Sequence, residues 1–229
     1  MARTAPTKRK ARQRQTFVCG EEFEAEARAA GARLIAGADE VGRGCLFGCV
    51  VAGACILDPA RPIAGLNDSK QLSEPQRLRL AAEIRGKALA WAVAEVDVAR
   101  IDQLNIGQAS RLAMKLAVEK LRPQPDAVLV DALVLDIPCW QRKIIHGDAR
   151  SVSIAAASIL AKVHRDAILC AWDKVYPQFC LASNKGYPTP RHKAALARFG
   201  PTPMHRKSYA PVRECLQAAL CFGGEEEEC

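Results

Sequence analysis

The sequence has no long uninterrupted apolar run and no paired cysteine motif. No stretch approaches the roughly 18 apolar residues of a membrane-spanning helix, and the basic N-terminus lacks the apolar core of a secretion signal. The ten cysteines are scattered and none forms a Cys-x-x-Cys pair, so neither a zinc site nor a redox motif is indicated. Cys45, Cys49 and Cys55 lie in apolar surroundings, where a free thiol packs as a small hydrophobic group. We therefore expect a cytoplasmic protein with reduced thiols and no membrane partner.

Acidic residues are missing from the first 16 positions, which carry six basic side chains. The whole chain has a net charge of +8, the run Glu225 to Glu228 contributes −4, and residues 17–224 carry +6. A basic folded part is consistent with a nucleic-acid partner, although many basic proteins bind none. We interpret residues 1–16 as a disordered basic tail, which either adds nonspecific phosphate contacts or is a solvated appendage. Residues 223–229 are interpreted as a flexible acidic tail.

Residues 17–222 are long enough, and apolar enough, for one domain with a substantial core. No internal repeat or second boundary is visible. Apolar runs predict strands at residues 34–36, 50–57, 91–96, 127–130 and 143–146. Helical spacing and capping residues predict helices at 21–30, 73–89, 105–121, 151–175, 190–199 and 210–220. Because strands and helices alternate, with helices dominating the C-terminal third, we expect an α/β fold: a central mixed β-sheet flanked by helices.

Two adjacent acids, Asp39 and Glu40, follow the first predicted strand and precede the loop Gly42-Arg43-Gly44. In an extended chain neighbouring side chains point to opposite faces, so the two acids need not crowd each other. Glycine permits close approach of the backbone to a ligand, and exposed amides with an arginine suit a phosphate or a sugar edge. The alternative is an ordinary turn with a structural arginine.

Two more acids follow predicted strands: Asp131 ends the strand 127–130, and Asp148 comes shortly after 143–146. Ligands of α/β sheets collect at such strand ends. Four carboxylates gathered there would repel one another without a counter-ion, and oxygen-only ligands select Mg²⁺ or Mn²⁺ over zinc. Two such ions about 3.5–4 Å apart can activate a water and stabilise the leaving oxygen of a phosphodiester. The alternative for Asp148 is a turn or helix cap.

Four other titratable residues rank below this acid set. Asp136 follows a loop instead of closing a strand. Asp166 lies inside a predicted helix, where a helix-surface salt bridge is favoured over metal ligation. His146 is interpreted as a strand end and His164 as a solvent-facing residue. No Ser-His-Asp or Cys-His arrangement competes with the carboxylates.

The stretch Gly37-Ala38-Asp39-Glu40-Val41-Gly42-Arg43-Gly44 resembles the N-terminal signature of the ribonuclease HII family. The resemblance extends in the family's order over residues 33–215. Its further blocks are Asn67–Ser73, Val130-Asp131, Gly147-Asp148, Ser158–Asp166, Lys185-Gly186-Tyr187 and His205–Tyr209. Some residues depart from the family pattern: Val41, Cys45, Phe47 and Cys49 stand where Ala, Pro, Ala and Pro are more frequent, and Ala132 stands where Gly usually follows the strand acid. These departures concern loop shape and leave the acid set intact.

The resemblance implies a ribonuclease H-like fold and assigns roles to individual residues. Asp39, Glu40 and Asp131 match the family's metal-binding acids, and Asp148 matches its fourth catalytic acid. The loop Gly42, Arg43, Gly44 matches the segment that senses a 2′-hydroxyl, the group that separates RNA from DNA. Tyr187 matches a tyrosine that stacks on the sugar beside the junction. Candidates for phosphate contacts, with solvated surface cations as the alternative, are Lys70, Lys162, Lys185 and Arg206.

The expected activity is hydrolysis of the RNA strand of RNA–DNA hybrids, and incision at single ribonucleotides in duplex DNA. Two divalent ions, Mg²⁺ or Mn²⁺, would assist, leaving 3′-hydroxyl and 5′-phosphate ends. We expect a monomer. One alternative is another two-metal nuclease of the same fold, such as a junction resolvase, and a second is a noncatalytic hybrid-binding module. Ribonuclease HIII is the nearest relative to exclude, since it carries a sizeable extra N-terminal domain and only about 30 residues precede the first predicted strand here.

Overall fold

The computed structural model describes residues 17–222, so both predicted tails, 1–16 and 223–229, lie outside the described residues. Its centre is a five-stranded sheet in the spatial order β3-β2-β1-β4-β5. The strand β1 pairs antiparallel with β2 and parallel with β4. The outer pairs β2–β3 and β4–β5 are antiparallel and parallel, respectively. The strands are β1 Ile35–Val41, β2 Val50–Ile56, β3 Ala90–Val96, β4 Ala127–Asp131 and β5 Trp140–Ile144. The predicted α/β class with a mixed sheet is confirmed.

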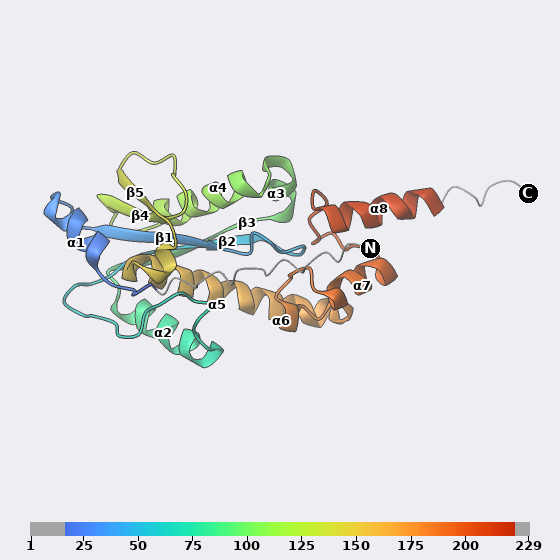
Figure 1. Cartoon of the computed structure of the whole chain (residues 1–229), viewed down its shortest axis with the longest axis horizontal. Coiled ribbons are helices and arrows are strands. Elements are labelled where there is room, and N and C mark those ends of the chain that lie inside the picture. The colour runs from blue at the N-terminus through green and yellow to red at the C-terminus, as the bar shows by residue number, and fades with distance from the viewer. Residues whose placement is uncertain (1–16, 223–229) are drawn as a thin grey trace, which may run out of the picture.

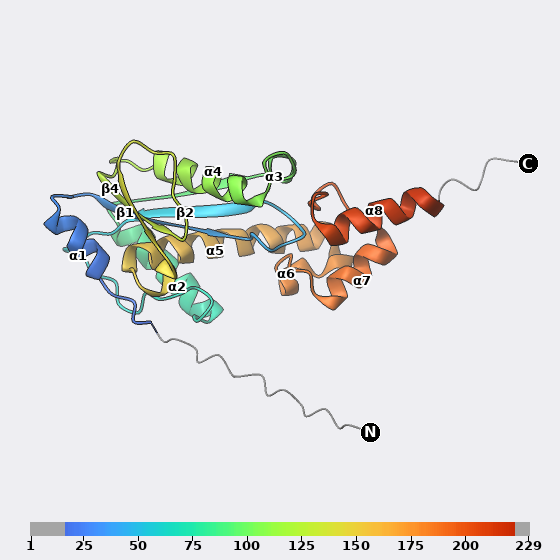
Figure 2. The same ribbon diagram turned by 45° about the horizontal axis from the view of Figure 1, so that its top comes forward.

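Helices cover both faces of this sheet (Figures 1 and 2). Helix α4 packs on one face and the long helix α5 on the other, with α2 lying against α5. Helices α6, α7 and α8 extend beyond one end of the sheet and form the predicted helical C-terminal part. The α-helices are α1 Glu22–Ala29, α2 Glu74–Lys87, α3 Val98–Leu104, α4 Ile106–Glu119, α5 Val152–Val175, α6 Leu181–Asn184, α7 Pro190–Phe199 and α8 Ala210–Phe222, with 3₁₀ turns η1 Gly147–Ala149 and η2 Pro177–Phe179.

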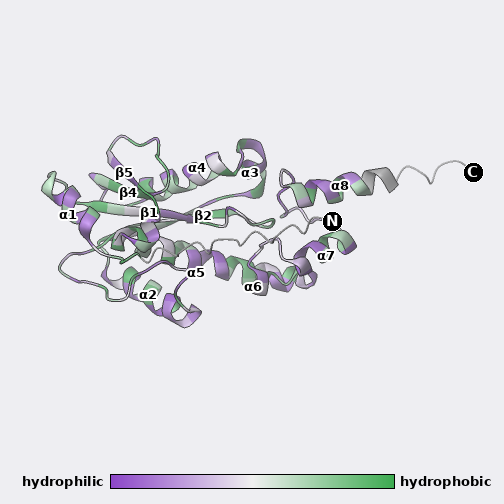
Figure 3. Ribbon diagram, in the orientation of Figure 1, coloured by the Kyte–Doolittle hydropathy of each residue, from purple (hydrophilic) through white to green (hydrophobic). Residues whose placement is uncertain are grey.

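Helix α2 packs against α5 through three buried side chains. Helix α2 carries hydrophobic and hydrophilic residues around its turns (Figure 3), and its buried positions Leu80, Ala81 and Ile84 face α5. Its start has the predicted capping box, in which the Ser73 amide donates to the Gln76 side chain at 2.8 Å. No helix among residues 17–222 is both long and apolar enough to span a bilayer.

Two glycines let α5 lie unusually close to the sheet. A Cβ on Gly37 of β1 would fall 2.1 Å from the backbone carbon of Ser153, and one on Gly53 of β2 would fall 2.2 Å from the carbonyl oxygen of Ala157. Both distances are far below any real contact, so the helix backbone rests directly on these strands. Gly53 pairs in register with Asp39, and this close approach brings the Ser158 side chain of α5 to the Asp39 carboxylate.

The elements of the structure differ from the expected ones in several places. Strand β1 continues through Asp39 and Glu40 to Val41, so the acids lie on the strand itself and not beyond it. Strand β5 starts at Trp140, three residues earlier than predicted, because this edge strand is polar and lacks an apolar run. Helix α3 was not predicted, although Asp97 caps it by accepting from the Arg100 amide at 2.8 Å.

Candidate active site

Asp39 is the most deeply buried acid of the predicted set, with 5% of its surface exposed. Its Oδ1 accepts a 2.7 Å hydrogen bond from the amide of Glu40. Burial raises the pKa of Asp39 well above its usual range, and the charges of Glu40, Asp131 and Asp148 raise it further. The other three predicted acids therefore lie close enough to Asp39 for their charges to act on it.

Glu40 lies beside Asp39 and takes part in the same charge cluster. Its Oε1 forms a 3.1 Å ion pair with the Arg43 guanidinium, and its Oε2 is buried without a hydrogen-bond partner among the described residues. Burial raises the pKa of Glu40, and Arg43 offsets part of that effect. A buried carboxylate oxygen without a partner is costly unless a ligand satisfies it.

Asp131 and Asp148 come from the neighbouring strand and the turn after β5. Oδ1 of Asp131 accepts a 2.7 Å hydrogen bond from the amide of Gly147. Burial raises the pKa of Asp131, whereas the Gly147 hydrogen bond lowers it. Asp148 is buried and its Oδ2 lies 3.3 Å from Nζ of Lys70. Asp131 thus lies on the parallel strand next to the β1 pair, and Asp148 reaches the same cluster from the turn after β5.

The donor chemistry of this cluster suits a hard divalent cation. It offers only carboxylate oxygens, burial and then the charges of neighbouring acids raise the pKa values of Asp39 and Glu40, and Glu40 Oε2 has no partner among the described residues. Within residues 17–222 no three acid, imidazole or thiol groups converge tightly enough to hold an ion as they stand. Two of the four acids are instead paired with cations of the chain: Glu40 with Arg43, and Asp148 with Lys70. Small side-chain rotations away from these cations would therefore precede ion binding.

The loop Gly42-Arg43-Gly44 lies against Tyr187, which the sequence separates from it by more than a hundred positions. A Cβ on Gly44 would sit 3.7 Å from Cε1 of the Tyr187 ring. The two segments are joined where the amide of Leu46 donates to the carbonyl of Gly186 at 2.8 Å. Tyr187 is 40% exposed, so its ring is open to a ligand beside the loop.

The four predicted phosphate contacts have different surroundings. Lys70 is largely exposed next to Asp148. Lys162 pairs with Asp166 at 2.8 Å, and Lys185 lies 3.9 Å from the same carboxylate. These three lysines lie around the acid cluster and the tyrosine loop. Arg206 does not share their position, as described next.

The prediction for Arg206 as a phosphate contact or a solvated cation is wrong. Arg206 is wholly buried, and its guanidinium donates to the carbonyls of Gly48, Arg43 and Cys49 at 2.9–3.2 Å. Its donors are directed at backbone carbonyls of the segment 43–49 between β1 and β2, so the side chain holds that segment in shape and has no surface to offer a phosphate. The Arg43 carbonyl also accepts from the hydroxyl of Tyr209.

A second buried arginine, which the sequence did not single out, supports the same loop. Arg165 of α5 donates to the carbonyls of Cys49, Lys185 and Phe47 at 2.9–3.3 Å. It also excludes a side chain at Gly42, where a Cβ would lie 2.3 Å from Nε of Arg165 and where φ is +96°. The sequence signal for a buried role was a charged residue within an alanine-rich helix. The sequence alone could not show that the Arg165 side chain points toward the loop carbonyls.

The residues ranked lower in the sequence lie as follows. Asp136 is fully exposed and pairs with Lys115 at 2.9 Å, away from the acids. Asp166 forms the expected helix salt bridge, yet it is buried and not on the helix surface. His164 binds Glu95 at 2.7 Å near the surface. His146 lies two residues past the end of β5 in a left-handed conformation.

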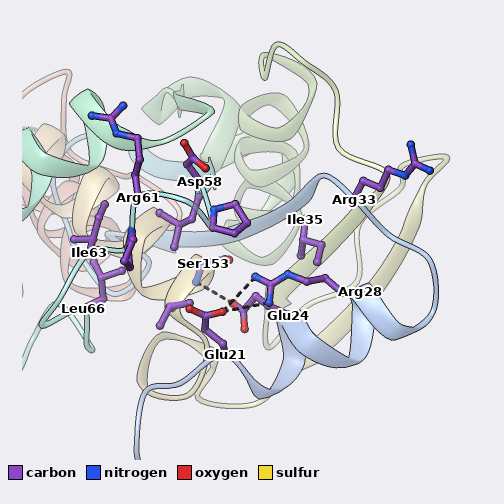
Figure 4. Close-up of a pocket in the computed structure, with 14 residues that line it drawn as sticks. Glu21, Glu24, Arg28, Arg33, Ile35, Asp58, Arg61, Ile63, Leu66 and Ser153 are labelled. Carbon is purple, nitrogen blue, oxygen red and sulfur yellow. Dashed lines mark hydrogen bonds and ion pairs between the residues drawn. The ribbon is translucent and has the colours of Figure 1, made fainter.

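A small, partly open pocket at the start of α5 contains none of the four acids (Figure 4). Its volume of about 70 Å³ is too small for a nucleotide. Figure 4 shows Glu24 pointing at Ser153, whose amide donates to it at 3.0 Å, and the Ser151 hydroxyl donates at 2.6 Å. Glu24 therefore caps α5 from outside the helix and anchors the element that carries Ser158, Lys162 and Arg165.

The described cysteines, residues 19–215, are all free thiols. Cys45, Cys49 and Cys55 are buried, as their apolar surroundings predict. Burial raises the pKa of Cys49 to about 11. A thiol with so high a pKa stays protonated at neutral pH and is a poor nucleophile.

Known proteins share this sequence over most of its length. The model of the family "Ribonuclease HII" matches residues 36–212. A ribonuclease HII from Solibacter usitatus (strain Ellin6076) is 56% identical over 197 residues, which cover 86% of this chain and 86% of the relative. Another from Koribacter versatilis (strain Ellin345) is 59% identical over 194 residues, which cover 85% and 76%.

Solved structures share the same fold. The crystal structure of ribonuclease H2 from Pyrococcus horikoshii OT3 matches with a TM-score of 0.70 at 27% identity, over 81% of this chain and 98% of that one. The structure of Bst ribonuclease HIII in complex with Mn²⁺ matches with a TM-score of 0.65 at 21% identity, over 84% and 72% of the two chains. The ribonuclease H-like fold is thereby confirmed.

Proposed function

The chain belongs to the ribonuclease HII family and is a metal-dependent endoribonuclease acting on RNA–DNA hybrids. From this membership we propose that it also incises duplex DNA at single ribonucleotides. The cut falls on the 5′ side of the ribonucleotide. Water adds to the phosphorus, the bond to the 3′ oxygen breaks, and a 3′-hydroxyl and a 5′-phosphate remain. Family membership also argues against the two alternatives, a junction resolvase and a noncatalytic module.

The residues that hold the reaction centre are Asp39, Glu40, Asp131 and Asp148. Their support is the cluster of raised pKa values and the unpartnered Oε2 of Glu40. Two divalent ions, Mg²⁺ or Mn²⁺, would supply an activated water and stabilisation of the leaving oxygen when bound. All four acids come from one chain, which agrees with a monomer as the active unit.

Cations around the acids prepare the approach of the phosphate backbone. Lys70, Lys162 and Lys185 lie near the site, and each is paired with an acid of this chain. A phosphate can take the place of such a carboxylate on an ammonium group, since both are anionic acceptors. The lysines then neutralise substrate charge while the acids remain free for ions.

Discrimination between ribose and deoxyribose falls to the loop Gly42-Arg43-Gly44 and Tyr187. The single observation that carries this proposal is the contact between them: Cε1 of the Tyr187 ring lies within van der Waals range of Gly44, 3.7 Å from where a Cβ would stand. The loop offers polar backbone groups to a 2′-hydroxyl, and the exposed ring offers a stacking surface to the sugar. A polar site left unpaired by the deoxy analogue rejects it strongly.

The test uses end-labelled duplexes that differ by one hydroxyl. Parent, Tyr187→Phe and Tyr187→Ala proteins are given a long RNA–DNA hybrid, a DNA duplex with one ribonucleotide, and the all-DNA duplex. We expect the parent to cut the first two and leave the third intact. Tyr187→Phe keeps the ring and should retain activity at the single ribonucleotide, whereas Tyr187→Ala should lose at least about tenfold there.

Two results would contradict this account of specificity. One is equal cutting of the all-DNA duplex by the parent. The other is a Tyr187→Ala protein that cuts at the single ribonucleotide as fast as the parent. Metal dependence is tested in the same assay, because cleavage should stop when a chelator removes divalent ions and return when Mg²⁺ or Mn²⁺ is added.

A further inference from the structure

Two buried histidines form a hydrogen-bonded pair behind Tyr187. His192 lies in the first turn of α7 and His205 lies thirteen positions later, and both side chains are fully buried. Their Nε2 atoms are 3.1 Å apart. Nδ1 of His192 is 2.9 Å from the carbonyl oxygen of Tyr187, and Nδ1 of His205 is 3.0 Å from the amide of Thr202. The chain of contacts therefore ends on the backbone of the candidate sugar-stacking residue.

The partners at the two ends of this pair fix its protons. A carbonyl oxygen can only accept, so Nδ1 of His192 carries a hydrogen and donates to Tyr187. The Thr202 amide can only donate, so Nδ1 of His205 is an acceptor without hydrogen. In the neutral pair the remaining hydrogen lies on Nε2 of His205, which donates to Nε2 of His192. A single arrangement of two neutral imidazoles satisfies all four ring nitrogens.

The pair also connects the chain that follows the loop Gly42-Arg43-Gly44 with the backbone of Tyr187. Phe47, which follows the sensing loop, bridges to His205 in the backbone and packs edge-on against its ring at 5.0 Å. The carbonyl of Tyr187 accepts from the Thr189 amide at 2.8 Å as well as from His192. Moving either imidazole would shift the sensing loop, the Tyr187 backbone or both.

We propose that His192 and His205 are positioning residues that set the orientation of Tyr187 toward the sugar through a fixed chain of hydrogen bonds. This inference rests on the proposed role of Tyr187 in reading the ribonucleotide. Neither histidine is a catalytic residue, because neither has exposed surface with which to touch a substrate. Their effect is transmitted by the carbonyl of Tyr187 and should be confined to the reaction that needs the ring.

Three variants of His192 separate the hydrogen bond from the volume. The amide nitrogen of asparagine occupies nearly the place of Nδ1, so His192→Asn can still donate to Tyr187. The longer His192→Gln places its amide near Nε2 and cannot make that bond in the same geometry, and His192→Phe keeps a ring without any donor. Leu196→Ala is the matched control, since Leu196 is buried on the same helix α7, in a hydrophobic cluster with Phe47, and its side chain has no hydrogen-bonding group.

The measured quantity is the ratio of kcat/KM on the single-ribonucleotide duplex to kcat/KM on the long hybrid. Each variant is made in the parent and in the Tyr187→Ala protein. We expect His192→Phe and His192→Gln to lower the ratio about tenfold in the parent, and by less than about twofold in the Tyr187→Ala background, because coupled residues are not additive. His192→Asn should stay near the parent, and Leu196→Ala should change the melting temperature without changing the ratio.

The two proposals fail in different ways. If Tyr187→Ala leaves the ratio unchanged, the role of the tyrosine itself is wrong. If Tyr187→Ala lowers the ratio but the His192 variants lower it equally in both backgrounds, or if Leu196→Ala lowers it as much as His192→Phe, the positioning role is wrong. Should His192→Phe not fold, the comparison of His192→Asn with His192→Gln decides the matter alone.

Discussion

The backbone amide of Gly147 donates a 2.7 Å hydrogen bond to Oδ1 of Asp131, and this bond joins the end of β4 to the turn that carries Asp148. The approach is tight: a Cβ on Gly147 would lie 2.6 Å from Cδ1 of Ile154 and 3.2 Å from the Asp131 oxygen. Two acids that are distant in the sequence are thereby held as one unit. A backbone hydrogen bond sets the orientation of the Asp131 side chain relative to this turn. A substitution at Asp131 that keeps the accepting oxygen should therefore keep this orientation.

Asp131→Asn preserves that oxygen and removes the charge. The carbonyl oxygen of asparagine can still accept from Gly147, so the melting temperature should stay close to that of the parent. Cleavage of a hybrid should fall more than about 100-fold, because a charged metal ligand is lost, while binding of the hybrid is retained. Asp136→Asn, at an exposed acid away from the cluster, is the control. Activity of Asp131→Asn within a few-fold of the parent would remove Asp131 from the reaction centre.

Asp39→Asn should stabilise the protein when no divalent metal is present. The pKa of Asp39 is raised in the folded state by burial and by neighbouring acids, so folding is opposed at every pH above the ordinary carboxyl range, where the unfolded chain is ionised. The substitution removes this penalty, and we expect a rise in melting temperature of about 2–4 °C at pH 7. The gain should shrink as pH falls toward 4, and Mg²⁺ should stabilise the parent more than the variant. A lower melting temperature at pH 7 in chelator would contradict this.

Asp166→Asn should strengthen the contribution of two lysines to substrate binding. The Asp166 carboxylate lies 2.8 Å from Lys162 and 3.9 Å from Lys185, and it neutralises both in the free protein. Without it, affinity for a hybrid at low salt should rise, and the slope of log K against log salt should steepen by up to about one. Asp136→Asn removes the same charge beside Lys115 and should leave the slope unchanged. Equal slopes for the two variants would make Lys162 and Lys185 bystanders.

The sequence predicted the elements that depend on local patterns. Strands β1 and β2 are apolar runs buried on both faces, and the capping box at Ser73 and Gln76 is a local signal that the structure confirms. The acids were found because each lies at or near the end of a strand. What could not be predicted depends on contacts between distant segments. Arg206 looked like a surface cation because nothing nearby in the sequence reveals that three carbonyls of another loop surround it.

The histidine pair illustrates the same limit. His192 and His205 are ordinary residues in the sequence, and only the packing of α7 against the segment before α8 brings their rings together. The start of edge strand β5 was predicted three residues too late, and helix α3 was not predicted, for a different reason. Both have polar residues at positions where a buried element would be apolar, so hydrophobic periodicity carries little information there.

Ala132→Gly tests one departure from the family pattern that the sequence did reveal. Ala132 follows Asp131 with φ of +52°, in the left-handed region, and its amide donates to the carbonyl of Ile144 at 2.9 Å. A residue with a Cβ is destabilised by about 1–2 kcal/mol in this conformation. Glycine avoids that strain but loses more chain entropy on folding, which offsets part of the gain. We expect a net gain of roughly 0.5–1 kcal/mol in the free energy of unfolding, measured by urea denaturation. Destabilisation would show that the turn tolerates alanine without strain.

The buried histidine pair should make stability depend on pH in a defined direction. Burial and the neighbouring His192 lower the pKa of His205 to about 3, and burial lowers the pKa of His192. In the unfolded chain both titrate near 6.5. Between these values the unfolded state binds more protons, so the free energy of unfolding should fall as pH drops below about 6.5, by up to about 1.4 kcal/mol per pH unit for His205. His205→Gln removes this group while keeping an amide donor, so its loss of stability between pH 7 and pH 4.5, followed by urea denaturation in chelator, should be smaller than that of the parent. Parallel curves for the two proteins would mean that His205 takes up a proton in the folded state as readily as in the unfolded chain, and the lowered pKa of His205 would then be wrong.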